Sequence, residues 1–274
     1  MSDLTERTHV CQEAIKAALR EIGLKRGDTV LVHSSLSSMG YVLGGPSTVI
    51  EAFLEVLDPT QGTLVLPTLC QKDIEKRFET WDIANSPSDV GRITEVGRLR
   101  PDAIRSDHPT HSVAAIGAHA EELVRDHGDA YGRPSPWGPA AFGHGSPWQR
   151  LYLWDAQYLF LGVTMSCNTI GHFAQAKFVA ECLEQAGDRR KQLAAELRGW
   201  QKPGVWPDFG FAVVEDWLQE KDAVRYTQLG EALLRATQAR PNVNTIVEKL
   251  RTVPETFLKE DFLDWLQRAR EARR

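Results

Sequence analysis

Four groups of polar residues in this sequence carry side chains that could do chemistry. They are His33 to Ser37, the aspartates Asp73 and Asp82, His108 to Ser112, and Asn168 to His172. A histidine can act as a general base near neutral pH without a large shift of its pKa. A carboxylate beside it can fix its tautomer, and hydroxyls and backbone N–H groups at helix starts can hold phosphate or thioester oxygens. These groups together would suit removal of a proton from an amine that attacks an acyl thioester.

Each group also has a purely structural interpretation. The serines after His33 could close a turn, His111 could bond backbone at a strand end, and His172 could be a neutral histidine of the core. His108 and His111 are three residues apart, but Pro109 prevents a continuous helix there, so no metal site is expected. The functional interpretation gains weight because the groups occupy equivalent places after predicted strands, where one crevice could hold them all.

Short apolar runs alternate with helical patterns through the first two thirds of the chain. This alternation predicts a layered α/β/α domain with a central mixed, mostly parallel sheet. Folds of this kind bind ligands outside the carboxyl ends of the strands, which is where the polar groups fall. Strands are predicted at 29–33, 63–66, 112–116 and 158–163, and helices at 5–22, from Gly44, and at 92–99, 119–125 and 168–183.

The last third of the chain has a different pattern. Residues 200–208 are rich in Trp, Pro and Gly and predict a loop, and helical patterns follow at 211–219, 228–238 and 260–273. We therefore expect residues 185–274 to form mostly helical cover on the same domain, so that 1–274 is a single domain.

Composition narrows the class of protein. Hydrophobic residues make up 42% and charged residues 25% of the chain, as in globular enzymes. No apolar run is long enough to span a membrane, and the first twenty residues lack a signal-peptide core, so no membrane partner and a cytoplasmic location are predicted. The net charge of −5 argues against a nucleic-acid partner and suits a cationic small substrate. The four cysteines show no paired spacing, which predicts reduced thiols. A homodimer is compatible with the sequence.

An ordered set of motifs resembles the aminoglycoside 3-N-acetyltransferases, an antibiotic N-acetyltransferase family distinct from the GNAT acetyltransferases. The resemblance covers Leu4 to Ala176. The motifs are LKRGD at 24–28 running into VLVHSSL at 30–36, GG at 44–45, GTLVLPT at 62–68, SP at 86–87 with Gly91, RSDHPTHS at 105–112, AE at 120–121, GSP at 145–147, and LGV at 161–163 followed by Asn168, Thr169 and His172.

The resemblance implies an acetyl-CoA-dependent N-acetyltransferase that acts on the 3-amino group of 2-deoxystreptamine and so confers antibiotic resistance. His172 matches the general base, and Asp73 matches an acidic residue of the active site. Asp73, Asp82 and Asn168 would meet the polycationic amine. Coenzyme A would be held by Ser34, Ser35, Leu36, Ser37, Thr110, His111 and Ser112, and the histidines with supporting roles would be His33 and His108.

The chain departs from the family pattern in three places. The family usually continues its catalytic histidine as His-x-Ala-Glu, whereas this chain has Gln175 in the last of these positions. Met165 stands where many members have a histidine. A later carboxylate that supports the histidine has no clean match, and Asp208 is the residue we expect in that role. The departures leave the base intact and leave open an acceptor amine other than an aminoglycoside.

Two further functions compete with acetyl transfer. A serine hydrolase could use Ser34 or Ser35 with His172, but the sequence has no G-x-S-x-G elbow. A non-catalytic homologue could bind coenzyme A without turnover, which the retained His172 argues against.

Overall fold

The computed structural model describes residues 7–72, 76–127, 133–199 and 202–272. Its centre is a seven-stranded sheet with the order β5–β6–β4–β2–β7–β9–β8. In that order the strands are β5 (Ile104–Arg105), β6 (Val113–Gly117), β4 (Thr63–Pro67), β2 (Thr29–Ser34), β7 (Gln157–Leu161), β9 (Ala232–Gln238) and β8 (Arg225–Leu229). A small separate sheet pairs β1 (His9–Val10) with β3 (Tyr41–Val42).

Parallel pairing is confined to the middle of the sheet. Strand β2 runs parallel to β4 and β7, whereas the β4–β6, β5–β6, β7–β9 and β8–β9 pairs are antiparallel. The α/β class and the mixed sheet are confirmed, but the sheet is less parallel than expected. Parallel neighbours need a long crossover connection, and the two edges of this sheet are instead built by short chain reversals, at 106–112 and at 230–231.

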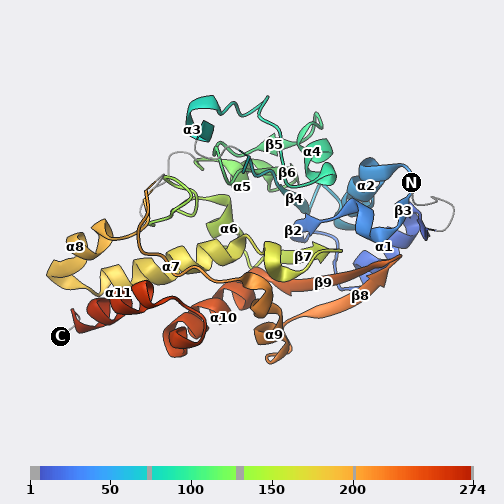
Figure 1. The fold of residues 1–274 in the computed structure, drawn as a ribbon. Coiled ribbons are helices and arrows are strands. Elements are labelled where there is room, and N and C mark those ends of the chain that lie inside the picture. Colours follow the sequence, from blue (N-terminus) through green and yellow to red (C-terminus); the bar gives the residue numbers. More distant parts are fainter. Residues whose placement is uncertain (1–6, 73–75, 128–132, 200–201, 273–274) are drawn as a thin grey trace.

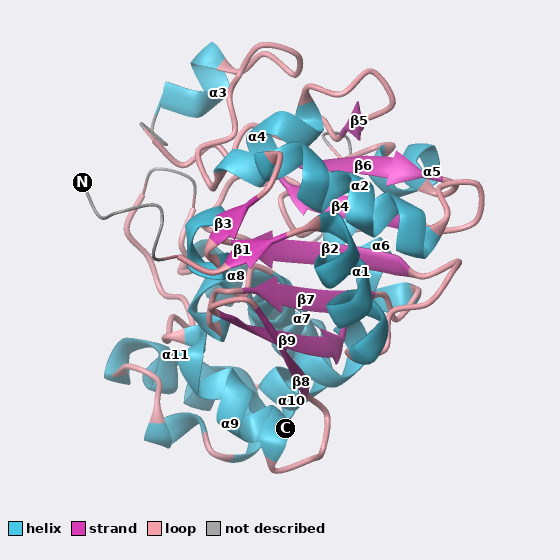
Figure 2. Ribbon diagram, turned by 90° about the vertical axis from the view of Figure 1, so that its right-hand side faces the viewer, coloured by secondary structure: helices cyan, strands magenta, loops and turns pink. Residues whose placement is uncertain are grey.

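Helices cover both faces of the sheet (Figure 2), and alternate residues of a strand face the two different layers. Val30 and Val32 of β2 pack in the core formed with α1 (Gln12–Glu21) and α2 (Gly45–Leu57). Leu31 lies in the other core, with the buried faces of the helices beyond the sheet. Because side chains alternate along a strand, His33 points to the same side as Leu31. His33 therefore points towards the helical layer that contains α7.

The second layer is built around three long helices (Figure 1). Helix α7 (Ile170–Glu184) packs lengthwise on α10 (Ala239–Thr252) and contacts α11 (Glu260–Glu271). None of the described helices is long and apolar enough to cross a membrane. The shorter helices are α3 (Arg77–Thr80), α4 (Arg92–Arg98), α5 (Ala120–Val124), α6 (Pro147–Leu153), α8 (Arg190–Ala195) and α9 (Val214–Gln219). Of these, α4 packs against α2 on the first side of the sheet.

The helix expected at 228–238 is wrong, because this segment forms the β8–β9 hairpin. Ala232, Leu234 and Ala236 are buried, whereas Leu233 between them is 38% exposed, so burial alternates with the period of a strand. Pairing of β9 with β7 overrides the helical propensity of these residues. The turn needs Gly230, which has a φ of 55° and whose Cβ, if present, would lie 2.2 Å from the Met39 carbonyl oxygen.

Candidate active site

A cavity of about 270 Å³ lies where β2, β4 and β7 end and α7 begins. This is the carboxyl edge of the parallel part of the sheet, as expected for an α/β fold. The cavity brings together four of the predicted site residues, His33, Ser34, Asn168 and His172. The other residues that line it are Pro67, Leu69, Gln71, Val90, Val163, Ser166, Cys167, Thr169 and Phe211.

A second cavity, of about 680 Å³, adjoins the first at Ser34, which lines both. Its walls include the predicted residues Ser35, Leu36 and Ser37 and the glycines at the N-terminus of α2. Arg7 and Arg92 also line it. Arg7 is paired with Glu231 at 2.9 Å. The exposed Arg92 guanidinium and the positive end of the 13-residue helix α2 are therefore the groups that could attract an anion here.

His172 stands in the first turn of α7, and its Nδ1 lies 3.0 Å from Oε1 of Gln175 one turn further along. Gly171 permits this placement because Phe211 covers it closely; a Cβ on Gly171 would lie 2.6 Å from Cε1 of Phe211. The hydrogen bond to Gln175 leaves Nε2 as the ring nitrogen available to the cavity. The predicted base is therefore at the cavity wall and is held by a neutral amide.

Aromatic rings surround the imidazole of His172. The ring centroids of Trp137 and Phe211 each lie 4.8 Å from that of His172, and those of Phe142 and His111 lie 5.8 Å and 6.1 Å away. Desolvation by these neighbours lowers the pKa of His172 from 6.5 to about 4, and the hydrogen bond to Gln175 opposes the shift only in part. His172 is therefore neutral at physiological pH, as a proton acceptor must be.

His33 is held in the cavity wall by Tyr158. The Tyr158 hydroxyl accepts the backbone N–H of Ile170 at 3.1 Å, so its own hydrogen is free to be donated to Nε2 of His33, 2.9 Å away. Burial lowers the pKa of His33 to about 3. The same hydroxyl thus links β2, β7 and the start of α7, which fits the supporting role predicted for His33.

Asn168 lines the cavity, but its side chain is already paired. Its Nδ2 donates to Oδ1 of Asn242 in α10 at 2.8 Å, and Nδ2 of Asn242 donates back to Oδ1 of Asn168 at 3.2 Å. Both residues are fully buried. The contacts therefore favour a structural role for the Asn168 amide over the predicted contact with substrate.

The predicted coenzyme A contacts at Thr110, His111 and Ser112 are not supported by their positions. All three side chains are completely buried, and none lines either cavity. Thr110 Oγ1 donates to the Trp137 carbonyl at 2.7 Å, so the Thr110 hydroxyl is the acceptor for Nδ1–H of His111, 2.8 Å away. Of the three, His111 packs against His172 and so forms part of the wall behind it.

His108 belongs to the same wall. Its Nε2 donates to the Pro139 carbonyl at 2.8 Å, and its Nδ1 accepts the backbone N–H of His111 at 3.1 Å. Burial lowers the pKa of His108 to about 4, which keeps the ring neutral. This arrangement fits the supporting role predicted for His108. Within the described residues, no group of three or more His, Cys, Asp or Glu side chains could hold a metal ion.

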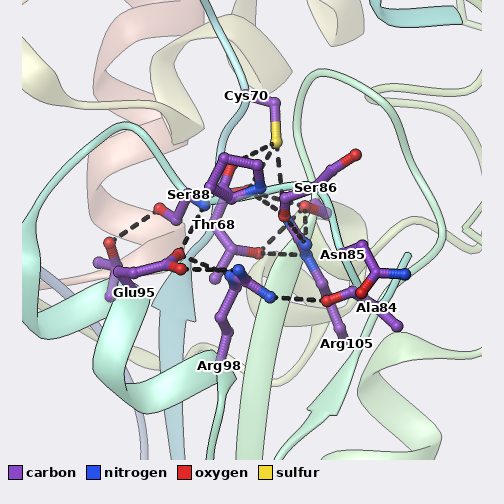
Figure 3. A network of polar contacts seen from close by, with 12 residues as sticks. Thr68, Cys70, Ala84, Asn85, Ser86, Ser88, Glu95, Arg98 and Arg105 are labelled. Carbon is purple, nitrogen blue, oxygen red and sulfur yellow. Dashed lines mark hydrogen bonds and ion pairs between the residues drawn. The ribbon is translucent and has the colours of Figure 1, made fainter. Parts of the chain in front are cut away.

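A half-buried arginine, Arg105, fixes the long loop that follows β4 (Figure 3). Arg105 donates to the carbonyl oxygens of Thr68 at 2.9 Å and Ser86 at 2.5 Å, and it lies 3.4 Å from Sγ of Cys70. The carboxylate of Asp89 accepts the backbone N–H groups of residues 71 and 72 at 2.7 and 2.6 Å. Together these bonds place Gln71 and Val90 in the cavity wall.

The predicted carboxylates have different outcomes. Asp73 lies outside the described residues. The carboxylate of Asp82 closes its own turn by accepting the backbone N–H groups of Ala84 and Asn85 at 2.9 and 2.7 Å. Asp208 forms an ion pair with Arg198. Since the polar partner of His172 is Gln175, the contacts do not support Asp208 as the carboxylate that holds the base.

Several site residues were not predicted from the sequence. Tyr158, Gln71, Cys167 and Phe211 belong to the cavity or hold its walls. The one available signal was Tyr158, a polar hydroxyl within a buried strand, which must find a hydrogen-bond partner. The other three come from loops or from the C-terminal third, where no periodic pattern fixes the position of a side chain.

The fold and the site define a class: an α/β protein with a neutral histidine at the carboxyl edge of its sheet, beside a larger cavity at the N-terminus of α2. Residues 31–251 match the family model described as aminoglycoside 3-N-acetyltransferase, and the chain belongs to this family.

Individual relatives agree with this assignment. A prophage-derived aminoglycoside N(3')-acetyltransferase-like protein of Bacillus subtilis (strain 168), YokD, is 32% identical over 60% of this chain and 64% of its own length. Aminoglycoside N(3)-acetyltransferase IX of Micromonospora chalcea is 33% identical over 61% of this chain and 62% of its own length. Each alignment thus spans less than two thirds of the relative.

A solved structure extends the similarity to nearly the whole fold. A mutant of aminoglycoside acetyltransferase AAC(3)-IVa in complex with a gentamicin has a TM-score of 0.71 and 26% identity to this chain. The superposition covers 97% of this chain and 98% of that one. The hairpin and helices of the C-terminal third are therefore included in the shared fold.

Proposed function

We propose that the protein transfers the acetyl group of acetyl-CoA to the 3-amino group of an aminoglycoside, with His172 as the general base. The observation that carries this proposal is the position of His172, whose Nδ1 is bonded to Gln175 and whose ring lines the cavity beside the larger one. Family membership supports the class of reaction, and the aminoglycoside held by a solved relative supports the class of acceptor.

The two adjoining cavities divide the substrates between them. The phosphates of acetyl-CoA would lie near Arg92 and the N-terminus of α2, where an exposed guanidinium and the helix dipole favour anions. From there the pantetheine arm would pass Ser34 and bring the thioester to His172. The acceptor would enter from the side of Gln71, Cys167 and Phe211.

The chemical step is a direct transfer. The amine nitrogen attacks the thioester carbonyl carbon, so a C–N bond forms and the C–S bond breaks. Nε2 of His172 takes the proton that the nitrogen must lose, and this proton can then protonate the departing thiolate to give free coenzyme A. Orientation of the two substrates would supply up to about 7–11 kcal/mol of the lowered barrier, and general base catalysis would add roughly 10²–10⁴-fold.

A smaller acceptor is the second candidate. Among the described residues that line the cavity, none is a carboxylate, so the part of the wall that the structure describes offers no partner for several ammonium groups. This observation favours an amine with a single cationic group, acetylated by the same chemistry.

A thiol-release assay tests both acceptors. Purified protein is given acetyl-CoA with a panel of 2-deoxystreptamine aminoglycosides and, separately, with simple monoamines. We expect release with the aminoglycosides, reduced at least about 10²-fold by His172→Ala and unchanged by His119→Ala, which alters an exposed histidine away from both cavities. Release with monoamines alone would favour the second candidate, and equal activity of the His172→Ala variant would exclude the proposed base.

A further inference from the structure

We propose that Gln175 is the positioning residue of the site. Hydrogen bonds to Trp206 and Pro207 fix the orientation of its side-chain amide. The fixed amide in turn holds His172 in the tautomer that carries its hydrogen on Nδ1 and leaves Nε2 unprotonated at the cavity. This inference deepens the proposed function and rests on the role of His172 as the base. It assigns the task that a carboxylate usually performs beside a catalytic histidine to a neutral side chain.

The orientation of the Gln175 amide follows from its two outer partners. Nε1 of Trp206 can only donate, and it lies 3.3 Å from Oε1 of Gln175. The carbonyl oxygen of Pro207 can only accept, and it lies 2.6 Å from Nε2 of Gln175. If the amide were reversed, its NH₂ group would face the indole N–H and its oxygen would face the Pro207 oxygen. Both contacts would become repulsive, so only one orientation is compatible with the site.

The amide orientation then decides the tautomer of His172. Oε1 of Gln175 is an acceptor, and Nδ1 of His172 lies 3.0 Å from it. Nδ1 must therefore carry the hydrogen, because a bare Nδ1 would place two lone pairs against each other. In a neutral imidazole the other nitrogen is then unprotonated. Nε2 is thus ready to accept a proton from the amine before any substrate arrives.

Burial of Gln175 and Trp206 makes any other orientation of the amide costly. Gln175 is 1% exposed and Trp206 is 2% exposed, so water cannot replace a lost partner. An unpaired polar group in such a place costs about 1–3 kcal/mol. The loop that supplies both outer partners is itself tied down, since Val205 exchanges backbone hydrogen bonds with Glu196 and Arg198 at 2.9 and 3.1 Å.

A neutral amide and a carboxylate at position 175 have different effects on the base. Glutamate would attract the imidazolium form and raise the pKa of His172. One of its oxygens would also face the Pro207 carbonyl oxygen, which now receives a hydrogen bond. Glutamine avoids both effects: desolvation by the aromatic surroundings lowers the pKa of His172 to about 4, and the hydrogen bond to Gln175, which raises this pKa, opposes the shift only in part.

The experiment combines a spectroscopic readout with a kinetic one. Nitrogen-15 NMR of the imidazole rings in the full-length protein reports which nitrogen of His172 carries the hydrogen, without any substrate. We expect Nδ1–H in the wild type and a mixture of tautomers in Gln175→Met, which keeps the side-chain length but removes both hydrogen-bonding groups. Trp206→Phe removes only the indole donor and tests the orientation of the amide in a second way. Gln267→Met, at an exposed position of α11, is the matched control.

The kinetic readout is the pH dependence of acetyl transfer. We expect kcat to fall by more than about tenfold in Gln175→Met, because a base in the wrong tautomer is inactive, while KM for acetyl-CoA stays unchanged. In Gln175→Glu the acid limb of the profile should move to higher pH, because a base with a raised pKa becomes protonated sooner as pH falls.

The outcomes separate this inference from the proposed function. In one outcome, the wild type shows the Nδ1–H tautomer, Gln175→Met and Trp206→Phe lose it, and no amine is acetylated. The positioning role of Gln175 then stands, and the proposed function fails. If amines are acetylated while the His172 tautomer and the pH profile remain the same in Gln175→Met and Gln175→Glu, Gln175 is not a positioning residue and the inference is overturned.

Discussion

Phe211 meets His172 edge to face, with 4.8 Å between the ring centroids and 71° between the ring planes. The two residues come from different parts of the chain, since His172 opens α7 and Phe211 lies in the short helical turn Phe211–Val213 that precedes α9. The contact removes water from one side of the imidazole. It is therefore one of the physical causes of the lowered pKa of His172.

Replacement of Phe211 should consequently change the pH dependence of the reaction. Phe211→Ala admits water to His172, so its pKa should rise from about 4 towards 6.5. The acid limb of the pH–rate profile should move in the same direction. Phe211→Leu keeps an apolar cover and should shift the limb less. An unchanged limb in Phe211→Ala would show that Phe211 does not desolvate the base.

The buried histidines should make the fold sensitive to acid. The pKa of His108 is lowered to about 4 and that of His33 to about 3, mainly by desolvation. Between these values and about 6.5 the unfolded chain binds protons that the folded chain does not, so the free energy of unfolding falls as pH falls through this window. The slope reaches at most about 1.4 kcal/mol per pH unit for each such histidine.

Urea unfolding between pH 7.5 and 4.5 measures this slope. His108→Gln can still donate to the Pro139 carbonyl but cannot titrate, so its unfolding free energy should depend less steeply on pH than that of the wild type. His144→Gln changes an exposed histidine and should leave the slope as it is. Equal slopes in the wild type and His108→Gln would show that His108 does not contribute.

The contact of Gly171 with Phe211 predicts a steric effect. Gly171→Ala places a methyl group 2.6 Å from the Phe211 ring, so we expect a loss of about 1–3 kcal/mol in unfolding free energy and a reduced kcat. Gly210→Ala, next to Phe211, places its methyl group in open space and is the matched control. Thermal and urea unfolding measure the difference, and equal stability of the two variants would contradict the prediction.

The proposed position of the acetyl-CoA phosphates predicts a change in KM without a change in kcat. Arg92→Ala removes an exposed guanidinium that lines the cavity, so we expect KM for acetyl-CoA to rise roughly tenfold, as for a lost charge-assisted hydrogen bond, with kcat unchanged. The effect should shrink at high salt, because screening weakens the attraction. A fall in kcat alone would place Arg92 elsewhere in the mechanism.

The sequence predicted the residues that follow strands better than those that come from loops. His33, Ser34 and His172 meet in one cavity because strand periodicity and a helix start determine where they point. Thr110 to Ser112 share a family motif, but the motif does not reveal that their side chains face inward. Two of the partners of Gln175, Trp206 and Pro207, lie more than thirty residues away in an irregular loop, and no local pattern could reveal those contacts.

The helix predicted at 228–238 was also wrong because contacts distant in the sequence decide its structure. Its leucines, alanines and charged residues favour a helix in isolation, and only the neighbouring strand β7 makes the extended form more stable. The expectation of a mostly parallel sheet depended on reading this segment as helix. Once the hairpin joins the sheet, it adds two antiparallel pairings.

The reciprocal amide pair of Asn168 and Asn242 has a consequence for how the helices assemble. Apolar side chains between α7 and α10 would tolerate a shift of one helix along the other, since each contact could be exchanged for a similar one. The two buried amides satisfy each other in a single alignment, and any sliding would leave both without partners. They therefore specify the register of the two helices, as a buried asparagine does in a coiled coil. In this way they fix the position of His172 along the axis of α7.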